Sequence, residues 1–228
     1  MGEISIFESL KAVTTATITT VLLKKGLRNV WLREAKPLQS NLPRVVGRAF
    51  TLRFVPARED LATPESSTRG AIEAMPEGCI AVVDAMGVTD AGIFGDILCA
   101  RMKKRGVAGL VTDGVVRDVA GVLGTGLPVW CDGAAAPPSV AGLTFVNWQE
   151  PIGCGGVAIF PDDVMVVDAD GAVVIPKTIV EEVAVLCVEQ ERLESWIMNE
   201  VEKGVPLPGL YPPNAEHKSR YEASRTKL

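Results

Sequence analysis

The stretch that decides the fold covers residues 95–118 and reads GDILCARMKKRGVAGLVTDGVVRD. Its first part predicts a helix over 97–105, with apolar residues on one face and basic residues on the other. Gly106 ends this helix, and the apolar run 109–112 is typical of a short buried strand. The Asp-Gly pair that follows predicts a turn, and a second short helix is predicted over 117–123.

Short strands and helices alternate on both sides of this stretch as well. The strands predicted there cover 45–55, 79–84 and 127–131, and a helix capped by Thr63 is predicted over 64–75. Strands that alternate with helices favour a partly parallel sheet with helices packed on it. The sequence therefore predicts the α/β fold class.

The two ends of the chain have a different pattern. Short helices are predicted over 4–11 and 14–25, with Thr14 or Thr15 as the N-cap of the second. The segments 157–160, 164–168 and 172–175 are predicted to be antiparallel strands, because only short turns separate them. We expect one domain over 1–228, made of these parts: N-terminal helices (1–26), an α/β core (45–176), a long C-terminal helix (177–203) and an extended tail (204–228).

Composition excludes several classes of protein. The 228 residues carry a formal net charge of −5, which disfavours a protein that binds nucleic acid. The only histidine is His217, so a cluster of histidine metal ligands is excluded and a Ser-His-Asp triad is disfavoured. The five cysteines form no CxxC pair, which indicates buried thiols in a reducing compartment, and no apolar run is long enough to span a membrane. We expect a cytoplasmic protein that binds neither nucleic acid nor membrane.

One group of residues suggests chemistry. Asp96 stands where a helix is predicted to begin, and Arg117 and Asp118 stand at the next such point. In an open α/β sheet these points line the crevice at the carboxyl ends of the strands, where ligands bind. The backbone N–H groups of Ile97 and Leu98 favour an anion, the guanidinium favours a carboxylate or enolate, and the two carboxylates suit a hydrated Mg²⁺ or Mn²⁺. These parts suit chemistry on a 2-oxo acid.

Structural roles compete with this interpretation. A Gly-Asp pair before a helix is often only a cap, and an Arg-Asp pair at a helix start is often a surface ion pair. The glycine-rich segment 153–156 precedes a predicted strand and lacks the Lys-Ser/Thr ending of a phosphate-binding loop, so it is interpreted as a turn. Asp84 and Asp90 are interpreted as turn and cap residues.

The segment 95–122, with VVDAMG before it and LPVW after it, resembles the RraA-like family. That family contains regulators of ribonuclease E activity and 4-hydroxy-4-methyl-2-oxoglutarate/4-carboxy-4-hydroxy-2-oxoadipate aldolases. Its marker is an aspartate followed after twenty residues by Arg-Asp, within GxxGD and DGxxRD, and the resemblance covers about residues 10–204. It implies a swivelling β/β/α sandwich that assembles as a trimer or hexamer with active sites between subunits.

The resemblance also implies roles for individual residues. Asp118 matches the aspartate that contacts the metal, and Asp96 matches the carboxylate that holds a metal-bound water. Arg117 matches the arginine that steadies pyruvate or its enolate. Glu194, with Glu191 as the alternative, matches a glutamate that reaches the active site of a neighbouring subunit from the C-terminal helix.

Gly95, Ile97 and Leu98 match the amide loop that binds the substrate carboxylate. The activity implied by the resemblance is a Mg²⁺- or Mn²⁺-dependent cleavage of a 4-hydroxy-2-oxo acid to pyruvate and a second carbonyl product, with decarboxylation of oxaloacetate as a side activity. The alternative is a non-catalytic protein that binds and inhibits a ribonuclease or an RNA helicase. The exact acid and the choice between trimer and hexamer stay open.

Overall fold

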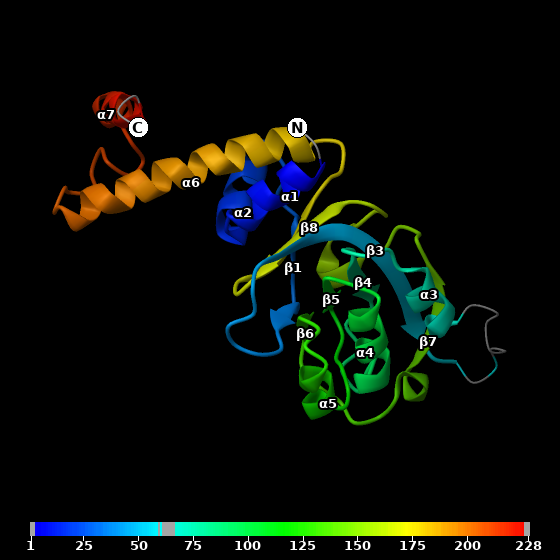
Figure 1. Cartoon of the computed structure of the whole chain (residues 1–228). Helices are drawn as coiled ribbons and strands as arrows, with labels where there is room; N and C mark the ends of the chain where they lie inside the picture. The colour runs from blue at the N-terminus through cyan, green and yellow to red at the C-terminus, as the bar shows by residue number, and fades with distance from the viewer. Residues whose placement is uncertain (1–2, 59, 61–66, 226–228) are drawn as a thin grey trace.

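The computed structural model describes residues 3–58, 60 and 67–225 (Figure 1). Its α-helices are α1 (Glu3–Lys11), α2 (Thr15–Lys24), α3 (Thr68–Ala74), α4 (Asp96–Lys104), α5 (Val119–Gly124), α6 (Val180–Glu202) and α7 (Ala215–Arg225). Its strands are β1 (Trp31–Leu32), β2 (Lys36–Pro37), β3 (Val45–Pro56), β4 (Ile80–Asp84), β5 (Gly109–Thr112), β6 (Val129–Cys131), β7 (Leu143–Trp148), β8 (Val164–Asp168) and β9 (Gly171–Ile175).

All the described strands belong to one curled sheet. Their order is β1-β9-β8-β3-β4-β5-β6-β2, with β7 beside β3. The first and last strands of this order, β1 and β2, follow each other directly in the sequence, so the sheet must curl until its two ends are neighbours. The predicted α/β class is confirmed, in the form of a mixed sheet with a long C-terminal helix.

Parallel pairing forms the half of the sheet that carries α4 and α5. β3, β4, β5 and β6 pair in parallel, and α4 and α5 connect β4 to β5 and β5 to β6. Side chains alternate along β4: Ile80 and Val82 belong to the core inside the curl, and Ala81 and Val83 pack against the helix side. Each large apolar side chain buried in this way stabilises the fold by about 1.5–3 kcal/mol.

The other half of the sheet is antiparallel and carries α1, α2 and α6. β8 pairs with β9 and with the first part of β3, as the close spacing of the last two predicted strands requires. Two side chains distant in sequence hold the start of α2: the Thr14 N–H donates to Glu191 Oε1 (2.7 Å) and the Thr15 N–H to Asp168 Oδ2 (2.9 Å). Thr14 is the N-cap of α2, because its side chain accepts a hydrogen bond from the Thr17 N–H.

Several sequence-based predictions are wrong. Residues 157–160 form no strand: a 3₁₀ turn covers Cys154–Gly156, and Ile159 makes an isolated bridge to Ile152. The tail is not extended throughout, because α7 folds back onto α6, where the Tyr221 hydroxyl donates to Glu189 (3.0 Å). The helix predicted over 64–75 begins at Thr68 with Ser67 as its N-cap, and the predicted cap Thr63 lies outside the described residues.

In the described part of the chain, no helix is both long enough and apolar enough to cross a membrane.

The five cysteines give a test of the packing. All are free thiols in buried positions, and burial raises the pKa of Cys79 to about 11 and those of Cys99 and Cys187 to about 12. Because the thiolate is the reactive form, the native protein should not react with 5,5′-dithiobis(2-nitrobenzoate) at pH 8. The same protein in guanidinium chloride is the control and should release five equivalents. Rapid labelling of a native thiol at pH 8 would contradict this packing.

Candidate functional site

The structure places the predicted site at the carboxyl ends of β4 and β5. The loop after β4 ends at Gly95, which is the N-cap of α4, so Asp96 is the first residue of that helix. The loop after β5 carries Arg117 and ends at Asp118, the N-cap of α5. Asp118 has φ 54°, in the left-handed region that few residues other than glycine adopt. A backbone strained in this way is common where a side chain must be aimed at a functional site.

Two glycines allow the acidic and basic side chains to approach one another. A Cβ atom on Gly95 would lie 2.7 Å from Asp118 Oδ2 and 3.3 Å from Arg117 Cγ. A Cβ atom on Gly121 would lie 2.8 Å from Asp96 Oδ2. Asp96 at the start of α4 therefore packs on α5, and the Arg117-Asp118 pair packs on the cap of α4. The structure thus brings Asp96, Arg117 and Asp118 to one place.

The arginine is held at both its backbone and its side chain. Its N–H donates to the Phe94 carbonyl (3.0 Å), and its Nε donates to Asp118 Oδ2 (3.0 Å). The side chains of Arg117 and Asp118 are 35% and 46% exposed, so both groups are accessible to a ligand. Solvent screens such a pair, and its contribution to stability is therefore small. The pair is better suited to binding than to holding the fold together.

The amide loop differs in one respect from the expectation. The Ile97 N–H donates to Asp96 Oδ1 at 2.7 Å, so a substrate carboxylate would have to compete with Asp96 for this donor. The Ile97 side chain is 79% exposed, whereas Leu98 is half-buried against the helix-side core. Gly95 has no side chain, so no side-chain hydrogen bond caps the start of α4.

Neither candidate glutamate reaches the site of its own chain. Figure 1 shows α6, which carries both, across one end of the molecule and α4 and α5 at the other end. Glu191 accepts the Thr14 N–H and hydroxyl at 2.7 and 3.0 Å, so it caps α2. Glu194 accepts a bond from Gln190 (2.7 Å) and a long one from the Thr17 hydroxyl (3.3 Å). Glu194 is therefore the less firmly held of the two.

Sequence reasoning missed Asp113 as a residue that supports the site. Its carboxylate is 5% exposed and accepts the Ala85 and Gly155 N–H groups at 2.8 and 3.1 Å. Burial is the main cause that raises its pKa above the usual aspartate value. Asp84 accepts the Met86 N–H (3.0 Å), which agrees with the predicted turn role. The Asp-Gly turn signal at 113–114 marked the position but gave no sign of these long-range bonds.

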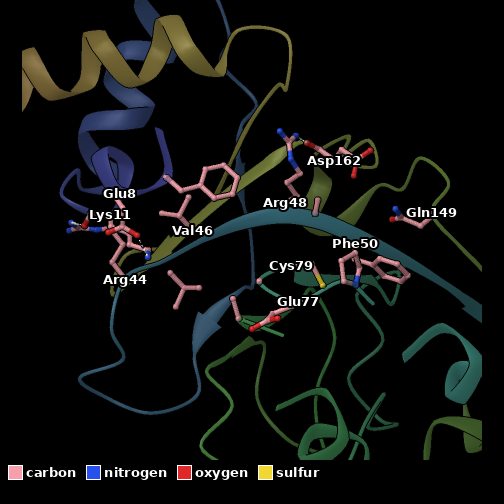
Figure 2. Close-up of a pocket in the computed structure, with 16 residues that line it drawn as sticks. Glu8, Lys11, Arg44, Val46, Arg48, Phe50, Glu77, Cys79, Gln149 and Asp162 are labelled. Atoms are coloured by element: carbon pink, nitrogen blue, oxygen red, sulfur yellow. Dashed lines mark hydrogen bonds and ion pairs between the residues drawn. The ribbon is translucent and has the colours of Figure 1, made fainter. Parts of the chain in front are cut away.

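A large groove lies at the opposite end of the parallel strands and contains none of the predicted site residues. It has a volume of about 620 Å³, and residues 76–79 and Ala108, which precede β4 and β5, form part of its wall. Figure 2 shows Glu8, Lys11 and Arg44 at one end of this groove and Gln149 at the other.

The described residues include no group of three or more His, Cys, Asp or Glu side chains that could hold a metal. The site offers instead two carboxylates, a guanidinium and the start of a helix. That set can bind an anionic ligand and hold a cation that keeps most of its water.

The packing of α5 against Asp96 can be tested with two glycines of that helix. A Cβ atom on Gly124 meets nothing within 4 Å, so Gly124→Ala should raise the free energy of unfolding by about 0.5–1 kcal/mol through helix propensity. Gly121→Ala should not raise the free energy of unfolding in this way, because the new Cβ atom would lie 2.7 Å from Asp96 Cβ. Urea unfolding of both variants measures the difference. Equal stabilisation by the two substitutions would show that Asp96 does not pack on α5.

Comparisons with known proteins agree on one family. The family model for RraA-like proteins, described as Aldolase/RraA, matches residues 15–174. A Halalkalibacterium halodurans protein named "Putative 4-hydroxy-4-methyl-2-oxoglutarate aldolase" is 36% identical over 177 residues, which are 77% of this chain and 79% of that protein.

Two solved structures share the fold. A Streptomyces coelicolor protein, described as an unusual member of the RNase ES inhibitor RraA protein family, is 33% identical with a TM-score of 0.79, over 86% of this chain and 96% of that one. An uncharacterised Pseudomonas syringae protein is 25% identical with a TM-score of 0.79, over 91% and 96%. This chain belongs to the RraA-like family of aldolases and RraA proteins.

Proposed function

We propose that this protein is a divalent-metal-dependent aldolase that cleaves a 4-hydroxy-2-oxo acid to pyruvate and a second carbonyl compound. The observation that carries the proposal is the packing of Asp96, Arg117 and Asp118 around Gly95 and Gly121 at the carboxyl ends of β4 and β5. The relative from Halalkalibacterium halodurans, whose name gives this type of activity, supports it. Oxaloacetate decarboxylation is the expected side activity, because loss of CO₂ leaves the same pyruvate enolate.

The residues present fit Mg²⁺ or Mn²⁺ held by few protein ligands. Mg²⁺ usually keeps several waters and binds through one or two carboxylates together with the substrate. Asp118 would be the ligand through Oδ1, because its Oδ2 atom accepts the Arg117 Nε–H. The metal, when bound, acts as a Lewis acid on the 2-oxo group and carboxylate of the substrate.

Arg117 supplies the fixed positive charge for the reaction. Its guanidinium would bind the pyruvoyl end of the substrate and stabilise the negative charge that develops on the 2-oxo oxygen as the C3–C4 bond breaks. A water oriented by Asp96 would accept the proton of the C4 hydroxyl, while the electron pair of the broken bond forms the enolate. The same water would then return a proton to C3, which gives pyruvate.

A second copy of the chain would complete the site. Glu194 is our choice for the glutamate contributed by a neighbouring subunit, because Glu191 is bound to the N-cap of α2. Exposed apolar side chains on the two loops and helices of the site, Ile97 (79%) and Leu123 (37%) among them, support an interface there in a homotrimer or hexamer.

The alternative function is a regulator that binds a ribonuclease or an RNA helicase without catalysis. The Streptomyces coelicolor relative, described as belonging to an RNase ES inhibitor family, favours it. A pull-down that retains a stoichiometric ribonuclease or helicase, from a protein that releases no pyruvate from any 2-oxo acid, would support the regulator over the aldolase.

The role of Arg117 can be tested with a panel of 4-hydroxy-2-oxo acids plus oxaloacetate, in an assay that couples pyruvate release to lactate dehydrogenase. The panel includes acids from aromatic degradation and acids derived from sugar acids, since both contain the pyruvoyl half. Arg117→Ala should lower kcat about 100- to 1000-fold, as expected when a group that stabilises transition-state charge is lost.

The matched control for this test is Arg101→Ala. Arg101 lies on α4, pairs with Glu73 (2.7 Å) and is 48% exposed, so its removal should leave turnover unchanged. Full activity in Arg117→Ala, or an equal loss in both variants, would overturn the assignment.

Metal dependence gives a second test. EDTA should stop pyruvate release, and Mg²⁺ or Mn²⁺ should restore it, because the substrate alone lacks a Lewis acid. Asp118→Asn should raise the Mg²⁺ concentration needed for half-maximal activity, because one negative ligand is lost. Circular dichroism of the EDTA-treated protein controls for unfolding. Turnover that is indifferent to chelation would remove the metal from the proposal.

A further inference from the structure

A pair of buried carboxylates lies directly beneath the loop that carries Arg117 and Asp118. β4 ends at Asp84 and β5 at Thr112, and the register of these parallel strands pairs Val83 with Thr112, so Asp84 and Asp113 follow at neighbouring positions. They are 6% and 5% exposed. Each carboxylate accepts hydrogen bonds from backbone N–H groups of nearby turns and loops.

These carboxylates hold the glycine-rich turn at 153–156. Asp84 Oδ2 accepts the Gly153 N–H (3.2 Å), and Asp113 Oδ2 accepts the Gly155 N–H (3.1 Å). The Cys154 thiol between them donates to the Val83 carbonyl (3.3 Å). The Gly155 carbonyl in turn accepts the Arg33 N–H (3.1 Å) in the connection between β1 and β2. The turn therefore joins the parallel half of the sheet to the strands that close its curl.

Asp113 is also the first residue of the loop that leads to Arg117. Its Oδ1 atom accepts the Ala85 N–H at 2.8 Å, which ties the loop to the end of β4. The next residue, Gly114, packs so closely that a Cβ atom on it would lie 2.6 Å from Ala85 Cβ. The rest of the loop bonds to segments that are themselves loops: Ile93 donates to the Val115 carbonyl. Asp113 thus connects the start of this loop to the end of β4, alongside the Thr112 hydroxyl of β5, which accepts the Gly114 N–H (3.0 Å).

We propose that Asp113 is a positioning residue for the site: by binding Ala85 and Gly155 it fixes the start of the 113–118 loop, and so sets where Arg117 and Asp118 stand. The kinetic consequence rests on the proposed aldolase function, whereas the structural consequence does not. Asparagine in place of Asp113 keeps the shape of the side chain but offers a single oxygen acceptor, so it leaves one of the two buried N–H groups facing an NH₂ group.

Asp163 provides a matched control elsewhere in the fold. It is also 5% exposed, and its two oxygens accept one backbone N–H each, from Phe160 and Lys177, both at 3.0 Å. It lies between β3 and the approach to α6, where its own carbonyl accepts the Ala49 N–H (2.7 Å). Asp163→Asn should therefore lower the melting temperature about as much as Asp113→Asn does, without moving the 113–118 loop.

The experiment compares Asp113→Asn with Asp163→Asn in kinetics and in amide hydrogen exchange. Asp113→Asn should lower kcat about 10- to 100-fold, as expected for a displacement of about 1 Å at a reacting centre, with a smaller change in KM. Asp163→Asn should leave both constants within about twofold. Exchange should become faster at 114–118 and 153–156 in the first variant, and only around 160 and 177 in the second.

Equal effects of the two variants on kcat, or unchanged exchange at 114–118 in Asp113→Asn, would overturn the positioning role. If the wild-type protein releases no pyruvate from any acid in the panel, the aldolase proposal fails, and the exchange measurement still decides the role of Asp113. Should Asp113→Asn fail to fold, Asp113→Ser with Asp163→Ser as its match takes its place in the same comparison.

Discussion

The structure depends on one strand that pairs with both halves of the sheet. The first residues of β3 pair antiparallel with β8, and its later residues pair in parallel with β4. Gly47 lies at the change of partner, where a Cβ atom would be 2.5 Å from the Gly78 carbonyl oxygen. A residue with a Cβ atom does not fit this close approach, so the chain requires glycine at position 47. The long arc of β3 is visible in Figure 1.

The parallel half of the sheet determines where the chemistry can sit. Parallel pairing places the carboxyl ends of β4 and β5 at one edge, and two helices begin there within contact distance of each other. Gly95 and Gly121 lie at the contact points. Because they have no Cβ atom, the carboxylates of Asp118 and Asp96 can pack against them. Binding groups near a helix start benefit from its dipole without additional charged residues. The proposed aldolase site needs no further element from its own chain.

The sequence predicted the central units well, because continuous apolar runs bounded by glycine, such as 109–112, have few alternative structures. Short strands at the ends of the sheet, such as β1 and β2, have only two residues each and carry no periodicity. The prolines at 206–213 favour an extended chain, so the sequence did not predict α7, which begins shortly after them at Ala215. Asp96, Arg117 and Asp118 could be found from spacing, but the partners of Asp113 and Glu191 are set by tertiary packing and left no local pattern.

The caps of α2 have a consequence for the order of folding. Thr14 is synthesised 177 residues before its partner Glu191, and Thr15 is synthesised 153 residues before its partner Asp168. During translation the α/β core between them can assemble while the first two helices still lack the acceptors for these N–H groups. The start of α2 therefore gains these two acceptors only after the segment that carries Glu191 has been synthesised.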